Sequence, residues 1–461
     1  METATLHKTS DVLANRHPFF DRTFNPLSPT PTQVAVAYGE RRIVKLNDLL
    51  KCGEVRPEAR VEALNHLMGQ LSSQEAKLRT VSEGTCAACT ALLSDDTPRV
   101  RALAARVLSS LCLVLQGRAE ASKAGALPLL AAMLTDPYAQ ARQGAAEALH
   151  SISDATDGTE MITDSPGCIE AICDAIGMPS LERPLVGTLC NLTRLLRATE
   201  AIIERGPVPR PLGLRSSGRP PHPCLCAPSS PEGSLLELAE RHVAGPIATT
   251  ALSALWNMMQ CAKGKAACVA CNGVPRLCVL VRDALPAMPA PAASWEPFPD
   301  LGLEPVARLD PGLSDTALQV QSTPYNAPLG LTDGYGANTV RALSTGCLAM
   351  GMLSLEGRHA AIGATPRPPQ WPPADPDPLH PVVEPPAPLQ CTNRECVPIL
   401  VTALLSREPF TASHSFRALA HLCELPAGRT AVIEAMQDAQ CPQELLTKVL
   451  EHVGRGASFP P

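Results

Sequence analysis

Residues 125–166, GALPLLAAMLTDPYAQARQGAAEALHSISDATDGTEMITDSP, have the pattern of a single unit of three helices. An apolar helix over residues 127–134 ends at Asp136 and Pro137, because proline lacks an amide donor and disfavours helix in the residue before it. A longer helix follows, with Ala145, Leu149 and Ile152 on one face, and a short helix around residues 159–162 completes the unit. One such unit cannot bury its apolar face alone, so the sequence predicts copies stacked above and below it.

The rest of the chain contains these copies. The glycines Gly84, Gly125, Gly167 and Gly206 follow one another at intervals of 41, 42 and 39 residues, and Gly273 begins a further unit. This period is typical of armadillo and HEAT repeats. The Gly-x-[Ile/Val/Leu]-Pro-x-Leu opening and the Ala-Leu-x-Asn-Leu-like core of the long helix resemble armadillo repeats. We therefore expect an all-α, right-handed armadillo/HEAT-like α-solenoid of about seven three-helix repeats.

Composition narrows the possible partners and the compartment. The chain has 461 residues, 45% of them hydrophobic, so it can bury a large core. Its formal net charge is −6 and no block of Lys or Arg occurs, which argues against nucleic acid and membrane as partners. Residues 1–20 lack the apolar core of a signal peptide, and no run reaches membrane-spanning length. The 18 cysteines are therefore expected to be reduced thiols in the cytoplasm.

The repeats are interrupted by proline-rich insertions, which divide the chain. In the first repeat we expect helices over residues 41–51, 57–71 and 74–82. The expected organisation is a disordered lead over 1–33, repeats 1–4 over 34–209, an insertion over 210–234, repeat 5 and the start of repeat 6 over 235–284, an insertion over 285–336, the rest of repeat 6 over 337–363, an insertion over 364–391, repeat 7 over 392–440, and a C-terminal cap and tail over 441–461.

The three insertions have two interpretations. Long loops on a rigid scaffold often carry binding, which would make them docking loops. They could equally be lineage-specific disordered expansions or unspliced sequence. Their proline-rich composition has no amphipathic or ligand-like pattern and favours the second interpretation.

Three groups of cysteines were tested as metal or redox sites: Cys86 with Cys89, Cys268 with Cys271, and Cys224 with Cys226 and His222. Tetrahedral zinc needs four ligands around one point, and the first two groups lie several repeats apart on apolar helices. Redox use of a Cys-x-x-Cys pair needs a strand-to-helix context that is missing. Packing as small apolar residues in the core is the favoured interpretation, and the third group is a looser metal candidate.

Catalytic motifs are absent from the sequence. It contains no Gly-x-x-x-x-Gly-Lys-[Ser/Thr] phosphate loop, no His-Glu-x-x-His and no Gly-x-Ser-x-Gly. The eleven histidines show neither metal spacing nor a companion arranged for nucleophilic catalysis. We expect no enzymatic activity, no cofactor, no metal and no small-molecule substrate.

The armadillo resemblance implies a binding face. In such solenoids the long helix lines a concave groove, where a ladder of asparagines grips an extended peptide backbone, since an amide both donates and accepts hydrogen bonds. Aligning the long helices on their Ala-Leu-x-x-Leu pattern gives, at the ladder position, His66, Ser110, Ser151, Asn191, Asn257 and His421, with Trp256 beside Asn257. The predicted protein-binding residues are Asn191, Trp256 and Asn257, with His66 and His421. The alternative is that these are ordinary polar residues on a solvated face.

A closer resemblance lies at the start of the first repeat. Residues 37–47, AYGERRIVKLN, follow a proline-rich lead and precede the armadillo units, and this stretch is similar to the radial spoke head 14 family of motile cilia and flagella. The resemblance implies a structural component of the axonemal radial spoke, located in the axoneme and cytoplasm, with other spoke proteins as partners. Tyr38, Arg41 and Arg42 are candidate contacts, because cations at a helix N-terminus oppose the macrodipole and suggest an acidic partner. A solvated pair of arginines is the simpler interpretation.

Two other functional classes are kept open. A soluble armadillo adaptor or cargo receptor would grip extended basic peptides and would carry acidic residues beside the asparagines. An enzyme or metal protein using the cysteine pairs would hold stoichiometric zinc. A spoke scaffold predicts neither property and instead predicts stable association with axonemes.

Overall fold

The computed structural model of this chain describes residues 42–51, 55–205, 231–242, 245–284, 337–363, 395–406 and 408–455. The chain divides into two compact units, one ending at Ala175 and the other beginning at Ile176. The lead over residues 1–33, the glycine at 206 and most of the three predicted insertions lie outside the described residues.

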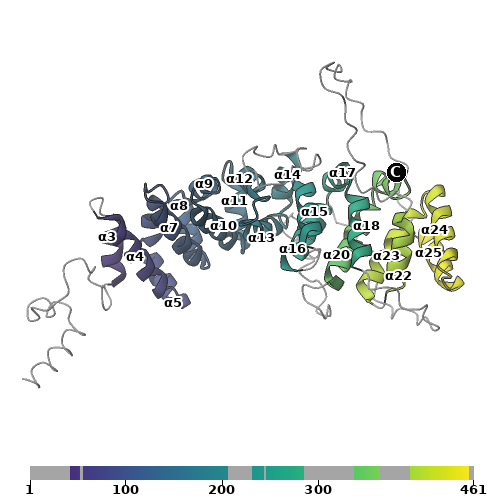
Figure 1. Ribbon diagram of the computed structural model, residues 1–461, viewed down its shortest axis with the longest axis horizontal. Coiled ribbons are helices and arrows are strands. Elements are labelled where there is room, and N and C mark those ends of the chain that lie inside the picture. Colours follow the sequence, from purple (N-terminus) through teal and green to yellow (C-terminus); the bar gives the residue numbers. More distant parts are fainter. Residues whose placement is uncertain are drawn as a thin grey trace, which may run out of the picture. The chain divides into compact units, whose positions relative to one another are not determined.

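Unit 1 is made of helices (Figure 1). They are α3 (Arg42–Lys51), α4 (Pro57–Gln70), α5 (Gln74–Ser82), α6 (Thr85–Leu92), α7 (Pro98–Leu111), α8 (Leu115–Lys123), α9 (Ala126–Met133), α10 (Ala139–Ser153), α11 (Thr156–Asp164) and α12 (Cys168–Ala175). The three helices expected in the first repeat are thus confirmed to within one residue at each end.

Unit 2 is also helical throughout its described residues. Its helices are α13 (Glu182–Leu192), α14 (Leu196–Glu204), α15 (Pro231–His242), α16 (Pro246–Met258), α17 (Ala262–Ala270), α18 (Gly273–Asp283), α20 (Ala337–Gly351), α21 (Leu355–Ala361), α22 (Cys396–Leu404), α23 (Pro409–Leu422), α24 (Pro426–Asp438) and α25 (Gln443–Arg455). α15 begins at Pro231, so its first four residues were assigned to the end of the first insertion. Proline is favoured in the first turn of a helix, where no amide donor is needed, so this proline starts a helix although it ends a proline-rich run.

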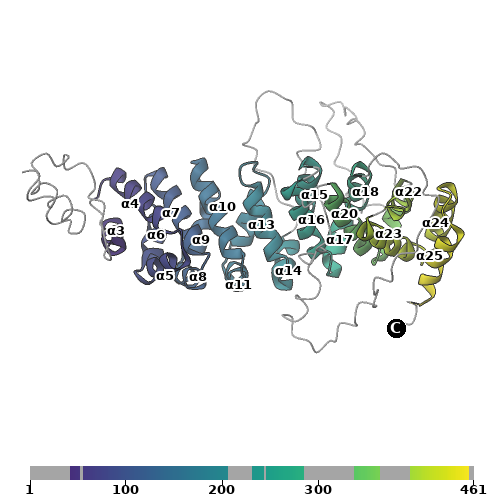
Figure 2. The ribbon, with the colours of Figure 1, turned by 90° about the horizontal axis from the view of Figure 1, so that it is seen from below.

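The described helices form triplets of a first, a long and a third helix, followed by α25. The long helices are α4, α7, α10, α13, α16, α20 and α23. Within unit 1, α4 packs on α7 and α7 on α10, while α5 packs on α8 and α3 on α6 (Figure 2). Within unit 2, the long helices α13, α16, α20 and α23 pack in that order. Helices of one kind therefore stack on their own kind, which makes each unit an armadillo-like α-solenoid.

The core of each unit runs along the inner faces of these stacks. In unit 1 the leucines of successive long helices, such as Leu64, Leu108 and Leu149, have no exposed surface. In unit 2 Leu252 and Leu419 lie in a continuous apolar cluster that extends from α15 to α25. Each repeat is thus stabilised mainly by burying its apolar face against the next repeat, as the sequence pattern predicts.

The turn before each first helix needs a left-handed residue. Gly84, Gly125 and Gly167 have φ angles of 77–78°, which glycine adopts without a steric penalty. At the corresponding turn of unit 2 the left-handed residue is Asn272, with φ 59°, and not Gly273. The prediction that Gly273 opens this unit is therefore one residue off, because asparagine also tolerates this conformation. Gly273 is the first residue of α18.

A second glycine position escaped the sequence analysis. Gly117 and Gly158 are the third residues of α8 and α11. A Cβ atom on Gly117 would lie 2.0 Å from the carbonyl oxygen of Leu111, and one on Gly158 would lie 1.7 Å from that of Ile152. Only glycine allows the third helix to pack this closely against the end of the long helix.

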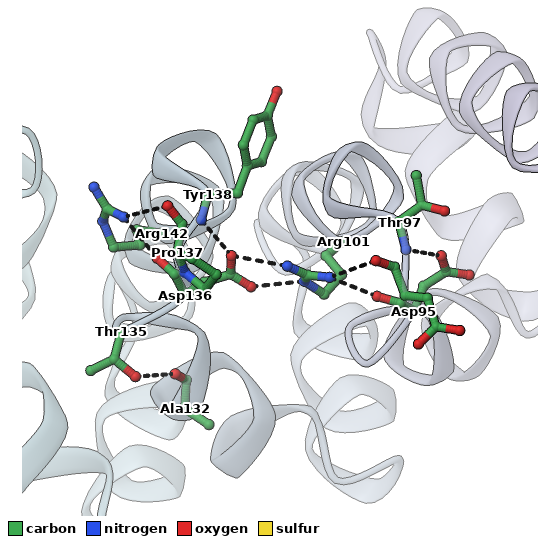
Figure 3. Close-up of polar contacts among 10 residues, drawn as sticks. Asp95, Thr97, Arg101, Ala132, Thr135, Asp136, Pro137, Tyr138 and Arg142 are labelled. Atoms are coloured by element: carbon green, nitrogen blue, oxygen red, sulfur yellow. Dashed lines mark hydrogen bonds and ion pairs between the residues drawn. The ribbon is translucent and has the colours of Figure 1, made fainter.

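Charged side chains connect neighbouring repeats in unit 1. Arg101 on α7 makes two hydrogen bonds to the carboxylate of Asp136, with Nε–Oδ2 2.7 Å and Nη2–Oδ1 3.0 Å, and its Nη1 donates to the carbonyl of Asp95 (Figure 3). Asp136 also accepts from the amide of Tyr138 at 2.7 Å. One repeat earlier, Arg60 Nη1 donates to Asp95 Oδ2 at 2.5 Å. These pairs fix how far each long helix is shifted along its neighbour.

Candidate protein-binding face

The structure defines the ladder positions more securely than the local sequence pattern does. The third residue of each third helix, such as Gly117 in α8 and Gly158 in α11, is a reference point shared by all the triplets. The residue seven positions before it marks the ladder position on the preceding long helix. These residues are Gly69, Ser110, Ser151, Asn191, Asn257, Met350 and His421. The predicted position in α4 is therefore corrected from His66 to Gly69, about one turn further along. Pro57 and Pro98 both begin their helices, and Arg60 and Arg101 both pair with the next aspartate, so α4 and α7 align at an interval of 41 residues. His66 instead contacts Glu62 of its own helix, with Nε2–Oε1 3.7 Å.

The two asparagines of the ladder lie inside the helix stack of unit 2. Asn191 and Asn257 are each 8% exposed. The Asn257 amide donates to Thr193 Oγ1 at 3.3 Å and to the carbonyl of Cys190 at 3.5 Å, so its donor group links α16 to α13. Contact between these asparagines and a bound peptide stays a prediction.

The remaining ladder residues also contact their own chain. Ser109 and Ser151 lie 2.9 Å apart between their hydroxyl oxygens, and Ser110 points at Met68 Sδ, 3.8 Å away. His421 Nδ1 lies 2.9 Å from Glu424 Oε1. Burial alone would raise the pKa of Glu424, but the hydrogen bond from His421 and the charge of Arg358 lower it overall.

Trp256 is half-buried and packs against other helices of unit 2. Its ring lies over Gly346 of α20, where an added Cβ atom would be 1.6 Å from Trp256 Cζ3. The same ring meets His414 of α23 edge-on, with centroids 4.9 Å apart. Phe410 also contacts His414, with ring centroids 5.4 Å apart. Whether Trp256 also anchors a partner stays a prediction, but a large part of its surface is used within unit 2.

His414 has an unusual environment in this cluster. It is 7% exposed, and its Nε2 is buried without a hydrogen-bond partner among the described residues. Burial, and secondarily the charge of Arg417, lower the pKa of His414 to about 4. The side chain is therefore neutral at physiological pH and acts as part of the packing around Trp256.

The predicted N-terminal contacts are described only in part. Tyr38 and Arg41 lie outside the described residues. Arg42 is the first residue of α3, and its Nη1 donates to Gln70 Oε1 at 2.6 Å. Arg42 therefore connects α3 to α4, and its contact with a partner stays a prediction.

An open hollow lies on the long-helix face of unit 1. It has a volume of about 400 Å³. Its walls come from α4, α7 and α10 and consist of Asn65, Arg99, Ala102, Leu103, Arg106, Gln140, Gln143, Gly144 and Glu147. Gly144 lies on its floor, where an added Cβ atom would be 3.0 Å from the carbonyl oxygen of Ala102. Sequence analysis missed this hollow, although the 41-residue interval places Asn65, Arg106 and Glu147 at equivalent positions of successive helices.

Arg99 and Arg106 distinguish this hollow electrostatically. Both are exposed, and neither takes part in an ion pair or hydrogen bond with the residues the structure describes. On the same helix, Arg101 is bound to Asp136. The acidic residue of the hollow is Glu147, whose Oε1 accepts from the side-chain amide of Gln143 at 3.0 Å. The hollow therefore offers two arginines unpaired within the described residues and one glutamate, a net positive charge, beside side-chain amides.

The cysteine pairs lie in or against the helical core. Cys86, Cys89 and Cys268 are at most 1% exposed, and Cys271 is partly buried, which confirms their predicted packing. Burial raises the pKa of the Cys86 thiol to about 12 and that of Cys89 still further. Among the described residues no group of three His, Cys, Asp or Glu side chains could hold a metal ion. The third candidate group, His222 with Cys224 and Cys226, lies outside them.

Comparison with known proteins gives structural likenesses only. No protein-family model matches the chain, and no curated protein matches its sequence. An engineered protein of known structure is 16% identical with TM-score 0.47, covering 89% of this chain and 87% of its own. A computationally designed armadillo repeat protein for modular peptide recognition is 14% identical with TM-score 0.44, covering 52% of this chain and 92% of its own.

A further designed armadillo repeat protein, solved in complex with the peptide (KR)4, is 14% identical with TM-score 0.42 and covers 51% of this chain and 90% of its own. Because these TM-scores are below 0.5, we base the fold on the helix order and packing of the chain itself.

In the described part of the chain no single helix is long and apolar enough to cross a membrane. The consecutive helices α17 and α18 meet the length and composition criteria only together, across a bend of 79°.

Proposed function

We propose that this protein is a non-enzymatic scaffold that binds other proteins through the long-helix face of its repeats. The observation that carries the proposal is the open hollow over α4, α7 and α10, which is lined by Arg99 and Arg106, neither of them paired within the described residues. A stack of identical helix types is rigid because each repeat is held by its neighbours. It can therefore present such a face to a partner without rearrangement.

The more specific proposal is a structural role in the radial spoke of motile cilia and flagella. The support is the AYGERRIVKLN stretch over residues 37–47, its proline-rich lead and the armadillo-like triplets that follow it. In this proposal the protein resides in the axoneme and cytoplasm, and its partners are other spoke and axonemal proteins. The proposed contacts are Tyr38, Arg41 and Arg42 at the N-terminal end, and Asn191, Trp256, Asn257 and His421 on the long helices.

The alternative is a soluble armadillo adaptor or cargo receptor that binds extended basic peptides. Asn191 and Asn257 on successive long helices favour it, since both occupy ladder positions. Their burial and the net positive charge of the hollow favour a different peptide chemistry.

Fractionation of cilia distinguishes these functions. Cells carrying the tagged protein are demembranated with detergent, and the axonemes are extracted with high salt and compared with spoke complexes by sedimentation. We expect the protein to stay with the axoneme through detergent and to sediment with spoke-sized particles after extraction. Release with the soluble matrix, or absence from cilia, would refute the spoke role and favour the adaptor.

A further inference from the structure

The hollow of unit 1 has a charge pattern that selects its partner. We infer that it binds an extended protein segment carrying two adjacent acidic residues, one directed at Arg99 and the other at Arg106. This inference rests on the proposed scaffold function and specifies the chemistry of the segment that the scaffold takes.

The charge of the hollow excludes a basic protein segment as its partner. Both arginines are exposed on the wall of the hollow and have no ion-pair partner in the described part of the chain. A basic segment would place its cations beside them and would be repelled. Glu147, whose carboxylate accepts a hydrogen bond from Gln143, offsets only one of the two positive charges, so the lining keeps a net positive charge. Arginine also binds carboxylates bidentately. Arg101, on the same helix as Arg99 and Arg106, binds Asp136 in this way.

The spacing of the two arginines specifies adjacent acidic residues. Arg99 and Arg106 are seven residues apart on α7, two turns of one helix face and about 10.5 Å along its axis. A segment that runs from α4 to α10 crosses α7 between them. Successive side chains of an extended segment point to opposite sides, so neighbouring carboxylates reach one arginine each. Carboxylates two residues apart would both face the same arginine.

The other walls of the hollow suit the backbone of such a segment. Asn65 on α4 and Gln140 on α10 line the hollow from its two outer helices. Both side-chain amides can donate to main-chain carbonyls, while Gln140 Oε1 already accepts from the Tyr138 hydroxyl at 2.8 Å. Gly144 and Leu103 also line the hollow and contribute no polar side-chain group. The chain's formal net charge of −6 and the isolation of this arginine pair favour a protein segment over nucleic acid.

Binding of labelled peptides to the full-length protein tests this inference. Fluorescein-labelled Gly/Ser decapeptides carry Glu-Glu, Glu-Gly-Glu, Gln-Gln or Lys-Lys at the centre, and fluorescence anisotropy is measured at protein concentrations up to about 1 mM in low salt. We expect Glu-Glu to bind at least tenfold more tightly than Gln-Gln and Lys-Lys, and more tightly than Glu-Gly-Glu of equal charge. Affinity should fall as salt rises, since both arginines are exposed.

Two double variants identify the site. Arg99→Gln with Arg106→Gln should abolish the preference for Glu-Glu. The matched control, Lys51→Gln with Arg56→Gln, removes the same charge at exposed positions outside the hollow and should keep the preference. Circular dichroism verifies that both variants are folded.

Several outcomes would overturn the inference: no binding of Glu-Glu, equal binding of Gln-Gln, tighter binding of Lys-Lys, or equal loss in the control variant. Self-association that Arg99→Gln with Arg106→Gln abolishes in sedimentation would identify a second copy as the occupant and would also overturn it. If the protein showed no preference for Glu-Glu but stayed with the axoneme, only the inference of an acidic binding segment would be refuted. A Glu-Glu preference in a protein that washes out of cilia would refute only the spoke role.

Discussion

The long-helix faces of the two units are built from the same kind of helix but differ in what covers them. In unit 1 the face over α7 and α10 is an open hollow with exposed arginines. In unit 2 the face over α20 and α23 is covered by Trp256, which lies over Gly346 and against His414. The repeat architecture alone therefore does not determine where a partner binds. The side chains that cover or expose the face determine it.

Glycine has a different role on each of these faces. Gly144 allows α10 to approach the backbone of α7, because an added Cβ atom would be 3.0 Å from the Ala102 oxygen. Gly346 instead makes room for an aromatic ring of another helix. Gly144 therefore deepens the hollow of unit 1, whereas Gly346 leaves the space that the Trp256 ring occupies in unit 2.

The largest expected effect comes from removing the space under Trp256. Gly346→Ala places a methyl group where the ring now lies, so Trp256 must move, and we expect a loss of about 3 kcal/mol of unfolding free energy. Urea denaturation followed by circular dichroism measures it. Gly144→Ala is the matched variant in unit 1 and should cost about 1 kcal/mol, since its closest contacts are 3.0–3.4 Å. Equal losses would contradict the proposed difference between the two faces.

Acid should weaken unit 2 through His414. Its pKa is lowered from 6.5 to about 4 in the folded chain, so the unfolded chain takes up the proton first as pH falls. The stabilisation is complete above pH 6.5, declines below it, and is lost by about pH 4, amounting to about 3 kcal/mol. Urea denaturation at pH 7 and pH 4.5 measures the loss. His414→Phe should lose distinctly less over this interval, and an identical loss in both proteins would refute the role of His414.

A smaller effect is expected at the ion pair between repeats of unit 1. Asp136→Ala leaves Nε and Nη2 of Arg101 and the Tyr138 amide without their acceptor. We expect a loss of about 2 kcal/mol, because the two charged side chains are only 15% and 7% exposed. Thermal denaturation measures it. Glu204→Ala removes an exposed partner of Lys263 and should leave the midpoint unchanged. A comparable fall in both variants would show that Asp136 contributes no more than a surface charge.

The smallest effect on stability should come from the hollow itself. Arg99→Gln with Arg106→Gln should change the unfolding free energy by less than about 0.5 kcal/mol, since neither side chain has a partner in the described residues. Thermal and urea denaturation measure it. A loss above 1 kcal/mol would mean that these arginines stabilise the fold, and their availability for a partner would then be in doubt.

Helix boundaries were predictable because their signals are local. Pro57 in a first turn, Asp136 before Pro137, and the left-handed glycines each act within a few residues of the chain. The first-repeat helices were found in this way. The C-terminal cap predicted within residues 441–461 is the helix Gln443–Arg455. The same local signals misplaced α18 by one residue, because Asn272 replaces glycine at its left-handed turn.

The binding face was less predictable because it depends on how helices stack. A local Ala-Leu-x-x-Leu match in α4 chose His66, whereas the ion pairs of Arg60 and Arg101 align Gly69 with the ladder. Tryptophan is a residue type common at binding sites, which is why Trp256 was predicted as a contact. Its environment, however, is formed by Gly346 and His414, which lie about 90 and 158 residues further along the chain. Such proximity follows from tertiary packing and leaves no signal in a short window.

The distribution of cysteines gives this solenoid a built-in set of probes of its own motions. Free thiols occur in five of the seven described triplets, from Cys86 and Cys112 in unit 1 to Cys347 and Cys423 in unit 2, and these four are buried. Burial raises their pKa, so they react with a labelling reagent only when their repeat opens. Mass spectrometry of timed alkylation would therefore report separately the opening free energy of each repeat that carries a buried thiol. A bound partner would appear as slower labelling in the repeats it covers, without any engineered reporter.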